Sequence, residues 1–179
     1  MAEEPHRYRA PAQALHWLTA LAVVSGVLFA IAMLNVSPGP QQNRFFDLHR
    51  SFGASVLALT GVRLLWRLAV APPPMVAGIP LWQERAARVT HAALYILLFA
   101  VPLVGWAGTS AFGAPIPVFG LFGLPMILDK DKALADVLLP LHGALALTLC
   151  ALVLLHIAAA VHHHFIRKDG TLRRMLPKV

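Results

Sequence analysis

Two histidines in the last long apolar segment, His142 and His156, stand fourteen residues apart. At about 100° of rotation per helical residue, fourteen steps return a side chain to within about 40° of the same helix face. The same steps separate the two side chains by about 21 Å along the helix axis. Because the hydrocarbon core of a bilayer is roughly 30 Å thick, this spacing predicts one imidazole near each membrane surface. Ionisable side chains at such depths are costly and are usually functional.

Two more histidines, His16 and His49, lie near the ends of the first two apolar segments. In antiparallel spans His16 shares a depth with His156, and His49 shares the other depth with His142. A haem iron with two axial imidazoles needs such pairs on facing helices. The alternative is that each is a core histidine satisfied by a backbone carbonyl. The pairing by depth favours two bis-histidine haem sites stacked across a membrane.

Arg63 follows His49 by fourteen residues, so it lies on the same helix face at the depth of His16 and His156. A guanidinium at this place could bind haem propionates through paired hydrogen bonds. Alternatively, the side chain extends to the membrane interface and keeps its charge in water. Arg67, one turn further along, is expected to be an interface anchor.

Two other histidines at the same depth have open roles. His91 lies early in the third apolar segment and could compete with His16 as an iron ligand. His163, in the run 162–164, follows His156 by seven residues and points about 20° from the same face. His163 could therefore hydrogen-bond a quinone carbonyl, or it could be a solvated histidine at the interface.

The elements that must position these residues are membrane-spanning helices. The chain has 179 residues, of which 58% are hydrophobic and 13% charged, whereas soluble domains are about a quarter charged. Four apolar stretches reach the roughly 20 residues that a span needs. The predicted spans are 12–34, 47–69, 87–109 and 137–163. We therefore expect an all-α transmembrane four-helix bundle, with residues 1–179 forming a single membrane-embedded domain.

Basic residues predict the orientation of this bundle. They are denser in the N-terminal segment, the connection between the second and third spans, and the C-terminal tail than in the other two loops. By the positive-inside rule both termini face the cytoplasm, and the apolar third loop, 110–136, lies outside as a lid on the membrane surface. The net charge of +7 needs no nucleic-acid partner, because no basic stripe with interleaved aromatic residues is present.

Cysteine usage restricts the kind of haem. Cys150 is the single cysteine, and no C-x-x-C-H motif occurs, so haem would be held noncovalently as haem b. Cys150 is expected to be a packing residue. The N-terminus does not read as a cleaved signal peptide, because its first apolar stretch is long enough to span a membrane.

An ordered set of segments resembles the prokaryotic cytochrome b561 family. The segments include ALHWLTA around His16, DLHRSFGAS around His49, PLHGALA around His142, LHIAAAVHHHF around His156, and the ending RKDGTLRRMLP. The resemblance covers nearly the whole chain, although AFGAPIPVFGLFGLP has no close counterpart. It implies a diheme four-helix cytochrome of the bacterial inner membrane, with His16 and His156 on one haem iron and His49 and His142 on the other.

The resemblance also implies a function. Ubiquinone is the expected redox partner, and the best-defined stand-alone members of the family resemble superoxide oxidases, which pass electrons from superoxide to ubiquinone. Arg44 and Arg50 are candidates for steering an anionic donor to the outer haem, although nearby aspartates weaken that case. The alternatives are a cytochrome b subunit that couples a partner dehydrogenase to the quinone pool, and a haem-free membrane transporter or structural protein.

Overall fold

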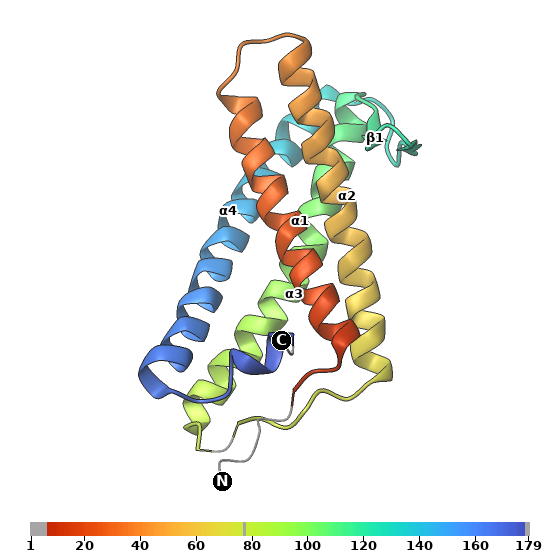
Figure 1. Ribbon diagram of the computed structural model, residues 1–179. Helices are drawn as coiled ribbons and strands as arrows, with labels where there is room; N and C mark the ends of the chain where they lie inside the picture. The colour runs from red at the N-terminus through yellow and green to blue at the C-terminus, as the bar shows by residue number, and fades with distance from the viewer. Residues whose placement is uncertain (1–6, 77, 178–179) are drawn as a thin grey trace.

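Four long helices form the molecule, which is described by a computed structural model over residues 7–76 and 78–177. They are α1 (Ala10–Leu34), α2 (Pro40–Ala69), α3 (Leu81–Phe112) and α4 (Lys132–His162), and they run side by side as a bundle (Figure 1). All four are long and apolar enough to cross a membrane. The predicted all-α four-helix bundle is confirmed. The helices extend beyond the predicted spans, and α2 begins seven residues before residue 47, because Pro40 is suited to a first helical turn.

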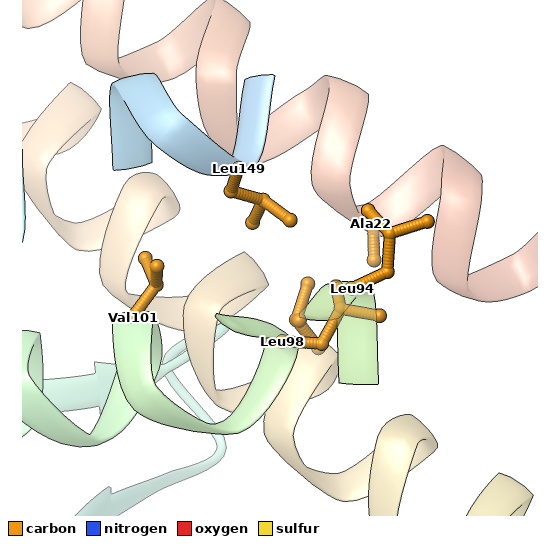
Figure 2. Packing of buried hydrophobic residues seen from close by; sticks show 6 residues of the cluster. Ala22, Leu94, Leu98, Val101 and Leu149 are labelled. Atoms are coloured by element: carbon orange, nitrogen blue, oxygen red, sulfur yellow. The ribbon is translucent and has the colours of Figure 1, made fainter. Parts of the chain in front are cut away.

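The helices pack as two antiparallel pairs, α1 with α2 and α3 with α4, and α2 also contacts α3. Their shared core is small. It contains Ala22, Val56, Leu94, Leu98, Val101 and Leu149, five of which are labelled in Figure 2. Only 6–28% of the most apolar window in each helix is buried within the molecule, so most large apolar side chains face outward, where lipid would cover them.

Small hydroxyl side chains are the most deeply buried polar groups in the bundle. Thr19 donates to the Leu15 carbonyl and Thr60 to the Val56 carbonyl, both at 2.6 Å, within their own helices. Both side chains are at most 1% exposed. Their small size lets neighbouring helices approach closely, as is usual in membrane helix packing.

One end of the bundle carries a short β-hairpin made of β1 (Ile116–Val118) and β2 (Phe122–Leu124), and we name it the hairpin end (Figure 1). Buried Ser51 of α2 anchors this hairpin. Its hydroxyl lies 2.8 Å from the Pro117 carbonyl and accepts from the Phe119 N–H at 2.9 Å. The predicted outer loop therefore contains a hairpin fixed to α2.

The opposite end, which we name the terminal end, is closed by the C-terminal tail, residues 163–177. The tail begins with a π-helical turn, His163–Arg167, and contains a 3-10 turn, Arg173–Met175. Trp17 donates to the Met175 carbonyl at 2.8 Å, and Gln13 donates to the Arg174 carbonyl at 3.1 Å. The Arg174 guanidinium donates to the Pro74 carbonyl at 2.5 Å. The tail thus joins α1 to the connection between α2 and α3.

Candidate functional site

A cavity of about 680 Å³ lies at the hairpin end. Its volume is within the range of about 300–1,000 Å³ for small-molecule and cofactor sites. All four helices and the hairpin contribute to its wall. The lining residues are Met33, Asn43, Phe46, Asp47, His49, Arg50, Gly53, Ala54, Leu57, Pro102, Gly105, Trp106, Thr109, Phe112, Ala114, Pro115, Ile116, Leu124, Leu139 and His142. The wall is mainly apolar and includes both histidines that the sequence paired at this depth.

His49 and His142 face each other with ring centroids 5.9 Å apart and ring planes at 81°. Nδ1 of His49 lies 2.9 Å from the Gly26 carbonyl, and Nδ1 of His142 lies 2.9 Å from the Val101 carbonyl. A carbonyl oxygen only accepts, so Nδ1 carries the proton on both rings. Each Nε2 then keeps its lone pair and has no hydrogen-bond partner within the described residues. Histidines that ligate metals are held in this way.

Gly105 of α3 gives the His142 ring its space. A Cβ at position 105 would lie 2.8 Å from Nδ1 and 2.9 Å from Cε1 of His142. By contrast, a Cβ at Gly53, which lines the same cavity, would meet nothing within 4 Å. Sequence reasoning did not identify Gly105, because its role depends on contact between α3 and α4.

A second histidine cluster lies nearer the terminal end. The ring centroids of His16 and His156 are 6.3 Å apart, and those of His91 and His156 are 5.3 Å apart. Arg63 donates to Nδ1 of His16 at 3.2 Å, so this nitrogen accepts and the His16 proton lies on Nε2. The structure therefore brings His16, His156 and Arg63 together, with His91 at least as close to His156 as His16 is.

Two arginines share one aromatic ring beside this cluster. The guanidinium carbons of Arg63 and Arg67 lie 5.5 Å and 5.9 Å from the Tyr95 ring centroid. No carboxylate in the described part of the chain forms an ion pair with either arginine. Arg63 is partly buried whereas Arg67 is exposed, so Arg63 is the one suited to an anionic ligand group at this depth.

His163 is held within the C-terminal tail. Its Nδ1 lies 2.6 Å from a carboxylate oxygen of Asp169, and both side chains are only 14% exposed. Burial alone would raise the pKa of the Asp169 carboxyl, but hydrogen bonds from Thr171 and His163 outweigh it and lower the pKa below its usual value of 3.8. His163 is thus largely buried, and its Nδ1 is occupied by Asp169. Sequence reasoning did not identify Asp169 as its partner.

This carboxylate predicts how the stability of the tail depends on pH. Because the pKa of Asp169 is lower in the folded chain, the ionised carboxylate stabilises the fold fully above about pH 4. This stabilisation is lost as the pH falls through the lower pKa of the folded chain. We expect Asp169→Asn to lower the free energy of unfolding by about 1–2 kcal/mol at neutral pH. Thermal unfolding at a series of pH values would measure this difference. A difference that persists undiminished at about pH 2 would contradict the assignment.

The two arginines proposed for steering occupy different environments. Arg50 lines the cavity and is only 19% exposed at its side chain, where it contacts Asp47 at 3.3 Å and the Pro115 carbonyl at 3.2 Å. Its guanidinium also lies 5.3 Å from the Phe46 ring centroid. Arg44 is exposed and lies outside the cavity wall. Arg44 is therefore the better placed of the two to act on a diffusing anion.

The histidine pairs suit an iron whose other ligands come from a cofactor and not from the chain. Across residues 7–76 and 78–177, no group of three or more histidine, cysteine, aspartate or glutamate side chains is arranged to hold a metal ion. Two facing imidazoles in an apolar cavity instead fit a haem, whose porphyrin supplies the remaining ligands.

Comparison with known proteins agrees with this interpretation. The profile of prokaryotic cytochrome b561 matches residues 7–178. The chain is 37% identical over 177 residues to cytochrome b561 homolog 2 of Escherichia coli (strain K12), which covers 97% of this chain and 93% of the relative. It is 33% identical over 164 residues to the probable superoxide oxidase CybB of Yersinia pestis, which covers 92% of each chain.

Proposed function

This chain belongs to the prokaryotic cytochrome b561 family, and we propose that it binds two haem b groups and transfers electrons from superoxide to ubiquinone. Membership makes it a bacterial multi-pass membrane protein that binds haem b and transfers electrons. The residues 1–179 are proposed to form one domain in the inner membrane. By the distribution of basic residues, the terminal end would face the cytoplasm.

The observation that carries the proposal is that His49 and His142 face each other in one cavity, with neither Nε2 atom hydrogen-bonded within the described residues. Both rings donate from Nδ1 to a backbone carbonyl, and both line the same apolar cavity. We assign them as the axial ligands at the hairpin end and His16 and His156 as the ligands nearer the terminal end. When bound, the haems supply the one-electron chemistry, and the chain supplies ligands, burial and charge.

Arg63 is proposed to bind the propionates of the haem nearer the terminal end. Carboxylates are stronger acceptors for a guanidinium than a neutral imidazole is. Transfer of the Arg63 hydrogen bond to a propionate would leave Nδ1 of His16 free to take the proton, and Nε2 free to bind iron. His91 is expected to remain a neighbour rather than a ligand.

His163 is proposed to hydrogen-bond a ubiquinone oxygen at the terminal end. Because Asp169 accepts from Nδ1, His163 has an N–H at Nε2 only when both ring nitrogens are protonated. Such an imidazolium can donate a hydrogen bond and then a proton to a quinone oxygen. Reduction of quinone to quinol requires protons, and a protonated His163 would be a source of them at this end.

The donor assignment can be tested directly. Superoxide supplied to the purified, haem-loaded protein should drive reduction of a ubiquinone analogue, and superoxide dismutase should abolish this reduction. His163→Ala should slow quinone reduction while the donor still reduces the haems rapidly. A protein with both haems bound that passes no electrons from superoxide to quinone would contradict the proposal. That result would favour the role of a cytochrome b subunit serving a partner dehydrogenase.

Electrostatic steering gives a separate prediction at the hairpin end. Arg44→Glu should lower the second-order rate constant with superoxide severalfold at low ionic strength, with unchanged haem content. The difference from wild type should shrink as salt rises, since exposed charges are screened beyond about 8 Å at physiological ionic strength. Stopped-flow kinetics at two salt concentrations would measure it. A rate indifferent to both salt and Arg44 would reject steering.

A further inference from the structure

A second cavity, of about 230 Å³, lies in the C-terminal tail directly after α4. Its lining residues are His164, Phe165, Lys168, Asp169 and Arg173. The π-helical turn ends α4 here, and Lys168 adopts a left-handed conformation with φ of 53°, which turns the chain back beneath the bundle. The cavity therefore lies at the level where a spanning helix leaves the apolar region.

The charge in this cavity is positive. Lys168 and Arg173 form no ion pair or side-chain hydrogen bond within the described residues. Asp169 is engaged elsewhere, because one carboxylate oxygen contacts His163 at 2.6 Å and Arg167 at 3.7 Å, and the other accepts from the Thr171 N–H at 2.9 Å. Two cations thus remain in the wall without a carboxylate of their own.

An apolar surface adjoins these cations. Phe165, which lines the cavity, is 66% exposed, and the next residue, Ile166, is 71% exposed. Large apolar side chains exposed at the end of a membrane-spanning helix are suited to contact with lipid acyl chains. Free phosphate would use the cations alone, whereas a phospholipid would use both parts of this surface.

We propose that this cavity binds one anionic phospholipid, with Lys168 and Arg173 contacting its phosphate and Phe165 contacting its acyl chains. Basic pockets at the cytoplasmic ends of membrane helices recognise anionic headgroups through the same combination of charge and depth. The cavity adjoins the proposed quinone site, because Asp169 lines it and also pairs with His163, but lipid binding here needs neither a haem nor a quinone.

Native mass spectrometry of the full-length, haem-loaded protein would test this proposal. The protein would be titrated with phosphatidylglycerol, with phosphatidylcholine, or with glycerol phosphate, which has the headgroup chemistry without acyl chains. The variant Lys168→Gln/Arg173→Gln removes both cations. Its matched control, Arg9→Gln/Arg85→Gln, removes two exposed cations outside the cavity wall, so the two double variants have the same net charge.

We expect wild type and the control to retain one phosphatidylglycerol per chain in preference to phosphatidylcholine. In Lys168→Gln/Arg173→Gln the affinity for phosphatidylglycerol should fall about 25-fold, because each cation near the surface contributes about fivefold. The single variant Lys168→Gln should show an intermediate loss, and Phe165→Ser should weaken lipid binding. Equal losses in the test and control double variants would overturn the proposal. Displacement of the lipid by equimolar glycerol phosphate would also overturn it, because it would identify a phosphate site.

Discussion

Alanine at position 142 is expected to reduce the haem content of the purified protein from two to one per chain. His142 lies opposite His49 in the cavity at the hairpin end, and its Nδ1 is fixed by the Val101 carbonyl. Without this imidazole the proposed haem there would keep only His49 as a ligand from the chain, because no third histidine in the described part of the chain lines the cavity. A pyridine haemochrome assay normalised to protein would give the count.

The same assay separates the two sites. His156→Ala should remove the haem nearer the terminal end and leave the other, so the two single variants should retain spectrally different haems. His91→Ala should retain both haems. If His91→Ala loses a haem whereas His16→Ala does not, then His91 and not His16 is the partner of His156 on that haem. If His142→Ala retains two low-spin haems, the proposed pair at the hairpin end is wrong.

A single methyl group at position 105 is expected to weaken haem binding at the same site. In Gly105→Ala the added Cβ would lie 2.8 Å from Nδ1 of His142, so the ring must shift and lose its hydrogen bond to Val101. Overpacking of this kind costs about 1–3 kcal/mol, which corresponds to roughly 5- to 150-fold weaker haem binding at the hairpin end. Haem retention during dilution and the midpoint potential of that haem would measure the change.

Gly61→Ala provides the matched control for this substitution. Gly61 also lies within a spanning helix, but a Cβ there would meet nothing within 4 Å, and it does not line the cavity. This variant should retain both haems with unchanged potentials, and it should gain up to about 1 kcal/mol in helix stability. Equal haem loss in the two alanine variants would show that the effect at Gly105 is not steric.

The helices could be predicted from hydropathy because lipid-facing spans must be continuously apolar. The depth of each histidine followed from its place in its span, and the structure brings together the two pairs that this depth predicts. Depth alone could not separate His91 from His16, and in the folded chain both rings lie close to His156. The carbonyl partners of His49 and His142 depend on contacts between helices, so the sequence carried no local signal for them.

The β-hairpin could not be predicted because its turn is stabilised from outside. Phe119 and Gly120 both have positive φ, at 51° and 72°, and phenylalanine rarely adopts this conformation. Here the Phe119 N–H bonds to Ser51, and its ring packs edge-on against Phe52 at 5.2 Å. These contacts with α2 offset the local strain. The pairing of His163 with Asp169 similarly depends on a π-helical turn that has no recognised sequence signal.

Hydrogen bonds between the first helix and the C-terminal tail have a consequence for biosynthesis. Trp17 and Gln13 bond to carbonyls that lie 158 and 161 residues further along the chain. These bonds join α1, the first helix of the bundle, to residues that follow α4, so they can form only after all four helices have been synthesised. Closure of the terminal end is therefore a late and long-range step in the folding of the chain.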